Sequence, residues 1–184
     1  MALTCSPAAL NGNECIDPTG GWIRAQVFEY SDIASITYDG TDTSQVTAIA
    51  LTSPAVPVLL TPAAADGTTY TVATPERDNQ VSAPILFNIS LGAQMKGFTA
   101  AQRAALSGYF GCCSLVAVVD LNNGETIVLG LEKNSTGFKA PVVPLFLSMQ
   151  NVEGGNYTGG ITNTLMFKAT HKDAPMFGKA LAIS

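Results

Sequence analysis

The sequence predicts a mainly β fold, either a β-sandwich or a barrel of about eight strands, with one flanking α-helix. Short segments of β-favouring residues recur along the 184 residues and are separated by Gly, Pro, Asn and Asp. The composition, 47% hydrophobic and 12% charged, suffices for one sizeable core. We therefore expect a single β-rich domain over residues 22–184. An extended N-terminal arm over residues 1–21, rich in turn formers, precedes it.

In the first half of the chain, β-favouring segments alternate with turns. Three prolines interrupt the apolar run between Thr52 and Pro62. Because proline cannot donate a ladder hydrogen bond, we expect an irregular or edge segment there. The clearest alternation of apolar and polar residues lies in Ala83–Leu91, as a half-buried strand requires. The predicted strands are Trp22–Tyr30, Ile33–Tyr38, Val46–Leu51, Thr68–Ala73 and Ala83–Leu91.

Residues 99–111 carry the helix signals. Thr99 is a suitable N-cap residue and Gln102 follows three positions later, as in a capping box. Ala105 and Tyr109 recur at helical spacing, and Gly111 ends the pattern. We expect a short helix here, on the flank of the strands.

A β-hairpin is predicted immediately after this helix. Leu115–Val119 is a continuous apolar run, and Asn123-Gly124 provides the positive φ angles that a two-residue turn requires. Residues 126–131 then return as the second strand. Two more strands follow, and a glycine-rich connection at residues 154–160 joins them. They are Ala140–Met149 and Ile161–Thr170.

Two proline-containing stretches, PAVPVLL at residues 54–60 and PVVPLFLSM at residues 141–149, hold more apolar residues than loops normally do. Either these residues line the core or another subunit covers them. The sequence leaves both alternatives open.

Catalytic patterns are scarce. His171 is the only histidine and stands beside Lys172 and Asp173, so we expect a solvated side chain rather than a catalytic one. The segment GGNYTGG at residues 154–160 has neither the Lys-Ser/Thr ending of a P-loop nor the order G-x-G-x-x-G, and we interpret it as a mobile loop.

The carboxylate pairs are interpreted as solvated surface: Glu29 with Asp32, and Glu76 with Asp78. We accordingly predict that the protein is not an enzyme and has no catalytic, cofactor-binding or metal-binding residue.

The cysteines give no sign of a metal or redox site. Cys5, Cys15, Cys112 and Cys113 include no C-x-x-C spacing, which argues against a zinc site and against a thioredoxin-like pair. A disulfide between Cys5 and Cys15 stays possible.

Charge and hydropathy exclude several classes of partner. The formal net charge is −5 and no cluster of Lys and Arg occurs, so tight nucleic-acid binding is not expected. We find no signal peptide and no apolar run of membrane-spanning length. A surface with few charges and many hydroxyl and amide groups is suited to protein partners.

The order of these segments resembles that of tail tube proteins of tailed bacteriophages over residues 22–170. The resemblance lies in DIASITYDG, VTAIALTS, YTVATPERDNQ before APILFNISL, the helix, CCSLVAVVDLNNGETIVLGLEKNSTGF and GGNYTGGITNTLMFKAT. It implies a structural virion protein that is assembled in the host cytoplasm. Such proteins form rings, usually hexameric, which stack into a hollow tube for DNA passage. The implied partners are the protein itself and other tail or head proteins, with DNA only in transit.

Under this resemblance we expect acidic residues to face the lumen and exposed irregular segments to mediate stacking. The lumen candidates are Glu29, Asp32, Asp120 and Glu125. The stacking candidates are the arm at residues 1–21 and the loop at Pro75–Gln80. Other virion components, such as decoration, head–tail joining or baseplate proteins, stay open as alternatives, as does a β-sandwich binding module.

Overall fold

The fold is mainly β in a computed structural model of the chain. The structure describes residues 21–53, 55–62, 68–73, 86–96, 104, 108–109, 114–134, 137–153 and 162–183. Within these ranges the strands are β1 (Trp22–Glu29), β2 (Ile33–Tyr38), β3 (Gln45–Leu51), β4 (Val58–Leu60), β5 (Thr68–Ala73), β6 (Phe87–Lys96), β7 (Leu115–Leu121), β8 (Thr126–Leu129), β9 (Glu132–Asn134), β10 (Gly137–Lys139), β11 (Val143–Glu153), β12 (Thr162–His171) and β13 (Met176–Ile183). One 3₁₀ turn, η1 (Tyr30–Asp32), joins β1 to β2.

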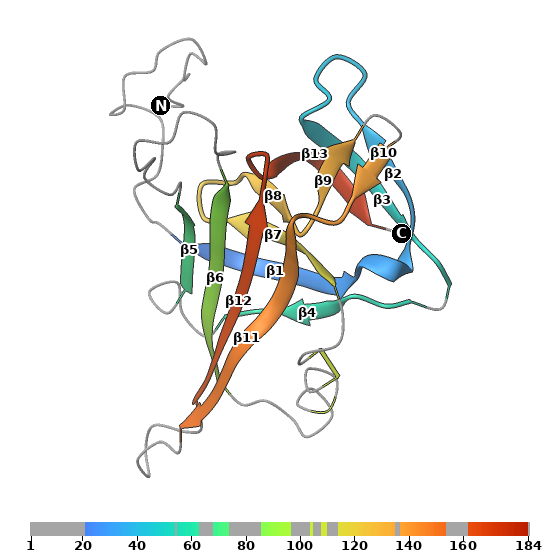
Figure 1. Cartoon of the computed structure of the whole chain (residues 1–184). Coiled ribbons are helices and arrows are strands. Elements are labelled where there is room, and N and C mark those ends of the chain that lie inside the picture. Colours follow the sequence, from blue (N-terminus) through green and yellow to red (C-terminus); the bar gives the residue numbers. More distant parts are fainter. Residues whose placement is uncertain are drawn as a thin grey trace, which may run out of the picture.

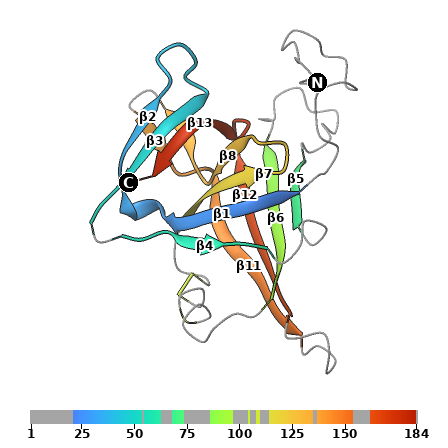
Figure 2. The ribbon, with the colours of Figure 1, turned by 180° about the vertical axis from the view of Figure 1, so that it is seen from behind.

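Eleven of the described strands form one large mixed sheet with two distinguishable parts, and β9 and β10 form a separate two-stranded sheet (Figure 1). Sheet A comprises β2, β3, β13, β8, β7, β1 and β4 in this order. Sheet B comprises β11, β12, β6 and β5. The two parts meet where Leu115 of β7 pairs with Leu145 of β11. Figures 1 and 2 show the strands of sheet B running across β1 and β4, so the two parts cross.

The main core lies between sheets A and B. Along β7, Leu115, Ala117 and Val119 point into this core, where they join buried side chains from β1, β6, β8, β11 and β12. Val116 and Val118 point to the opposite face of sheet A and belong to a second core. Because successive side chains of a strand point to opposite faces, this continuous apolar run marks a strand that is buried on both sides.

The two-stranded hairpin β9–β10 packs over the second core. Phe138 contacts the edge of the Tyr30 ring, with 5.7 Å between ring centroids. The Tyr38 hydroxyl donates a hydrogen bond to the carbonyl oxygen of Gly137 at 3.0 Å. The Lys133 ammonium lies 5.3 Å from the centre of the Tyr38 ring. These contacts attach the hairpin to β2 and η1.

Trp22 links the two sheets at the other end of β1. Its side chain is 1% exposed, and its indole Nε1 donates a hydrogen bond to the carbonyl oxygen of Gly92 on β6 at 3.0 Å. Its backbone N–H donates to Thr68 Oγ1 on β5 at 3.1 Å. A buried indole normally finds such a partner, and here the partner belongs to the opposite sheet.

The prediction of a mainly β fold is confirmed. A closed barrel is not formed by the described strands, because the pairing order begins at β2 and ends at β5. The hairpin around Asn123-Gly124 is confirmed, and Gly124 has φ +84°. The proline-rich segment contains only the short edge strand β4, as expected. The predicted strand Ile161–Thr170 is also confirmed as β12, on which Leu165, Phe167 and Ala169 are buried.

Other expectations need correction or lie outside the described ranges. The strand count of about eight was too low, since β9, β10 and β13 were not predicted. Their segments are short or lack clear alternation, so local pattern gave no signal for them. Of the predicted helix at residues 99–111, only Ala104, Gly108 and Tyr109 are described, and Ala104 alone has a helical assignment.

Gly130 provides the first testable prediction. It has φ +83°, and a Cβ atom there would lie 2.2 Å from the carbonyl oxygen of Leu115, at the junction of the two sheets. Gly124 has nearly the same φ but open space around its Cβ position. We expect Gly124→Ala to cost about 1 kcal/mol of stability, for the left-handed backbone alone. Gly130→Ala adds a backbone clash and should cost about 3–4 kcal/mol.

Urea denaturation of both variants measures the difference. Because the two glycines share their φ value, Gly124→Ala is a matched control for conformational strain. Equal losses in the two variants would contradict the close approach of Gly130 to β7.

Candidate functional site

His171 is buried, which corrects the expectation of a solvated side chain. It is 0% exposed, and its Nε2 accepts a hydrogen bond from the backbone N–H of Gly130 at 3.2 Å. Burial lowers the pKa of His171, although the charges of Glu132 and Asp173 act in the opposite direction. The alternation Leu165, Phe167, Ala169 on β12 continues to position 171 on the same buried face. The every-second-residue spacing of these buried positions was the sequence signal for burial of His171. The charged neighbours Lys172 and Asp173 led instead to the prediction of a solvated side chain.

Glu132 is a buried residue that sequence reasoning did not single out. Its side chain is 1% exposed, and Oε2 forms an ion pair with Lys139 Nζ at 3.2 Å. Its Oε1 accepts a hydrogen bond from the backbone N–H of Lys172. The carboxylate thus connects β9 to β10 and to the end of β12. Among the described residues, no three His, Cys, Asp or Glu side chains gather as metal ligands would.

The four acidic lumen candidates do not form one cluster. Glu29 and Asp32 lie at the end of β1, where Glu29 pairs with Leu115. Asp120 and Glu125 lie near the start of β1, beside the β7–β8 turn. Asp120 Oδ2 forms an ion pair with Arg24 at 2.6 Å. All four belong to sheet A or to the turns next to it.

Sheet B has two free edges within the part of the chain that the structure describes. The strand β11 pairs with β12 along one edge. On its other edge, only Leu145 pairs with β7. At the opposite side of the sheet, β5 pairs with β6 alone. Free strand edges present unpaired N–H and C=O groups and readily pair with another chain. The strands β11 and β12 also extend beyond the other described strands (Figure 1).

The face of sheet B that points away from the core carries a shallow groove of about 400 Å³. The cross-strand rows place Thr71, Ser90, Lys168 and Phe146 side by side on this face. Four of the lining residues carry hydroxyl or amide side chains and five are apolar, while Lys168 is the one charged residue among those described. The lining consists of Thr71, Ala73, Asn88, Ile89, Ser90, Val143, Phe146, Lys168, Ala169 and Thr170.

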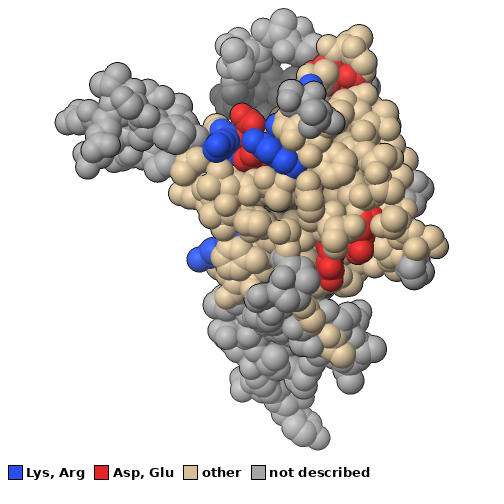
Figure 3. All heavy atoms as spheres, turned by 45° about the vertical axis from the view of Figure 1, so that its right-hand side comes forward, with Lys and Arg blue, Asp and Glu red and all other residues tan. Residues whose placement is uncertain are grey.

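A second groove, of about 510 Å³, lies between the hairpin β9–β10, the β2–β3 turn and the start of β13. Its lining consists of Thr43, Ser44, Glu132, Lys133, Asn134, Asp173, Ala174 and Met176. It contains charges of both signs. Elsewhere on the face seen in Figure 3, uncharged residues predominate.

Both proline-containing apolar stretches divide between core and surface. Leu60, Leu145 and Leu147 are buried, so part of each stretch lines the core. Five of their large apolar side chains are nevertheless exposed: Val56, Leu59, Val142, Val143 and Phe146. Exposed apolar groups of this kind are typical of surfaces that another protein covers.

Several predicted features lie outside the described residues. These are the arm at residues 1–20, the loop at Pro75–Gln80 with its pair Glu76 and Asp78, the glycine-rich segment 154–160 and all four cysteines. The stacking and disulfide predictions therefore stay predictions.

The chain has no match among protein-family models, among curated proteins or among solved structures. No helix in the described part is both long and apolar enough to cross a membrane.

Tyr70 on the edge strand β5 provides a second prediction. The side chain packs against the main core, and burial raises the pKa of Tyr70 to about 12. The neutral phenol is thus favoured in the folded state, and the unfolded chain loses this proton first, near pH 10.0. The stabilisation is present below pH 10.0 and is lost as the pH rises towards about 12. Tyr70→Phe should remove this alkaline loss, as measured by urea denaturation across that range. An unchanged alkaline profile in Tyr70→Phe would contradict the burial of this phenol.

Proposed function

We propose that the protein is a structural virion subunit that assembles into rings, and that these rings stack into the hollow tail tube of a tailed bacteriophage. The observation that carries the proposal is the four-stranded sheet B, whose edge strands β5 and β11 each have a side that is largely unpaired among the described residues. The order of segments that resembles tail tube proteins supports the same assignment. We further propose that the protomer is a β-sandwich whose two layers are sheets A and B.

The two free edges suit a ring because they differ from each other. A ring needs heterologous contacts, in which one surface of a protomer binds a different surface of the next. If β11 of one protomer pairs with β5 of its neighbour, the sheet continues around the ring. Backbone hydrogen bonds then supply the contact without charged side chains, as in other cases of strand addition. The scarcity of charge along the chain agrees with such a contact.

In this arrangement the groove-bearing face of sheet B lines the interior of the ring. The other face of sheet B packs against sheet A through the main core. Sheet A has more strands than sheet B, so in a ring it is better accommodated on the outside, where the circumference is longer. Among the residues that the structure describes, the interior then presents apolar side chains together with hydroxyl and amide groups, and Lys168 is its one charged residue. The four acidic candidates on sheet A would lie outside this face.

An interior of this composition is compatible with DNA in transit. Each lysine or arginine that neutralises a phosphate adds affinity through counterion release, so a face with few cations binds DNA weakly. The overall charge of −5 acts in the same direction. The polyanion is therefore expected to pass without being retained.

A binding module is the second candidate, and the mixed-charge groove beside β9–β10 is the observation that favours it. Electron microscopy and light scattering of the purified full chain separate the two candidates. Rings or tubes support the assembly function. A stable monomer at all concentrations would overturn it and favour the binding module or another virion component.

The edge pairing is tested with lysine substitutions, because lysine is a common means of blocking edge strands in natural proteins. Val72 on β5 is 39% exposed and Phe146 on β11 is 36% exposed. We expect Val72→Lys and Phe146→Lys each to weaken ring formation at least about tenfold, or about 1.4 kcal/mol. Light scattering over a dilution series measures the loss, and circular dichroism verifies folding.

Phe177→Lys is the matched control. Phe177 is 47% exposed, yet its strand β13 pairs with β3 on one side and with β8 on the other. The substitution makes the same chemical change where no free edge exists, so assembly should persist. Equal effects of all three substitutions would show that the edges are not the contact.

Stacking is tested by deleting residues 2–20. The first described strand begins at Trp22, so the deletion should leave the domain folded and the rings intact. Stacking into tubes should weaken, because the predicted terminal arm is suited to contact neighbours. Electron microscopy counts rings against tubes, and tube formation equal to that of the full chain would exclude the arm as a stacking contact.

A further inference from the structure

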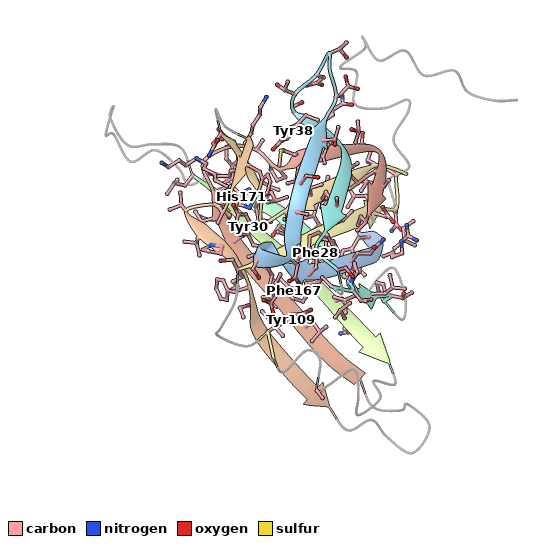
Figure 4. All side chains as sticks on the ribbon, turned by 90° about the vertical axis from the view of Figure 1, so that its right-hand side faces the viewer. Phe28, Tyr30, Tyr38, Tyr109, Phe167 and His171 are labelled. Atoms are coloured by element: carbon pink, nitrogen blue, oxygen red, sulfur yellow. The ribbon has the colours of Figure 1, made fainter. Side chains whose placement is uncertain are left out.

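The junction between sheets A and B contains a buried imidazole whose hydrogen bonding fixes its protonation state. Gly130 lies directly after β8 of sheet A, and His171 is the last residue of β12 in sheet B. The Gly130 N–H donates to His171 Nε2 at 3.2 Å, so this nitrogen must be unprotonated. In the neutral ring the proton is then on Nδ1, for which the structure gives no hydrogen-bond partner among the described residues. Figure 4 shows His171 above Phe167, among the side chains of the interior.

A second hydrogen bond joins the same two segments. The backbone N–H of Lys172 donates to Glu132 Oε1, and the other oxygen of Glu132 pairs with Lys139. The end of β12 is therefore attached to the β8–β9 region at two adjacent points. One of them, Glu132, already has both oxygens engaged. The other, His171, depends on a nitrogen that can take up a proton.

Protonation removes the first attachment. With protons on both nitrogens, the imidazolium can no longer accept from Gly130, and two N–H groups would face each other. The cation would also be buried, which costs free energy unless it is paired. The charged groups near His171 are Glu132 from β9, Lys139 from β10, and Lys172 and Asp173 from its own segment. Glu132 and Asp173 favour the charged imidazole, but the cost of burial outweighs their effect and keeps the pKa of His171 lowered.

We propose that His171 is an acid-sensitive latch, which holds the end of sheet B against the β8–β9 region in its neutral form and releases it on protonation. The released segments are the Gly130 turn and the end of β12. Release precedes global unfolding, because β7 and the two cores do not depend on this hydrogen bond. The latch does not rest on the proposed function and operates in the single protomer.

The sign of the pH dependence follows from the lowered pKa of His171 in the closed state. In the open state the imidazole returns to an ordinary pKa near 6.5 and takes up the proton first. The free energy that favours the closed state, in which Gly130 donates to His171, is therefore greatest above pH 6.5. It decreases as the pH falls below this value. The opening equilibrium rises by up to about tenfold for each pH unit in this window.

Hydrogen exchange of the full chain tests the latch, read by mass spectrometry at about pH 7.5 and about pH 5.5 and corrected for intrinsic exchange. Between these two conditions, protection of the peptides covering residues 127–132 and 167–173 should fall about tenfold. The peptide covering residues 33–51 is the internal control and should not change. His171→Gln retains an acceptor but cannot titrate, so its protection should be the same at both pH values. An equal loss in His171→Gln, or no loss in the wild type, overturns the proposal.

A second measurement keeps the test valid if His171→Gln does not fold. The chain contains one histidine, so an untagged sample gives a single imidazole signal in NMR. The latch requires a pKa below 6.5 and the tautomer with the proton on Nδ1. A titration at the ordinary pKa, or a proton on Nε2 in the neutral ring, would exclude it.

Discussion

The rest of the structure depends on the burial of β7 on both faces. This strand pairs with β1 along one edge and with β8 along the other, and its first residue, Leu115, also pairs with Leu145 of sheet B. Its side chains contribute to both cores in alternation. Each buried leucine or valine contributes about 1.5–3 kcal/mol relative to an exposed one. This strand therefore contributes to both cores and joins sheet A to sheet B.

The central position of β7 also determines which surfaces stay accessible to partner proteins. Sheet A is covered by sheet B on one face and by the β9–β10 hairpin and the second core on the other. Among the described residues, one face of sheet B is covered, and the edge strands β5 and β11 each have a side that is largely unpaired. The exposed apolar residues Val72, Val143 and Phe146 lie on these two edge strands. The assembly that we propose would use this surface.

Buried polar groups concentrate where the two sheets meet. Trp22 donates across the gap to Gly92 at one end, whereas Gly130 donates to His171 at the other. Glu132 adds the hydrogen bond from Lys172 and its ion pair with Lys139. A buried polar group is costly without its partner, so such contacts favour one relative placement of the sheets over others. Burial lowers the pKa of the His171 imidazole, and this group carries the acid sensitivity that we propose for this end of the junction.

The sequence by itself determined the mainly β class, the hairpin at Asn123-Gly124 and the buried faces of β7 and β12. These features follow from local rules: turn geometry fixes a hairpin, and alternation fixes which residues share a face. Only the tertiary structure decided the strand order, the parallel pairing of β13 with β3 and the two free edges of sheet B. It also placed His171 against Gly130, 41 residues away in the sequence. Local patterns specify how a strand is buried but not which distant strand it pairs with, because that choice depends on packing of the whole chain.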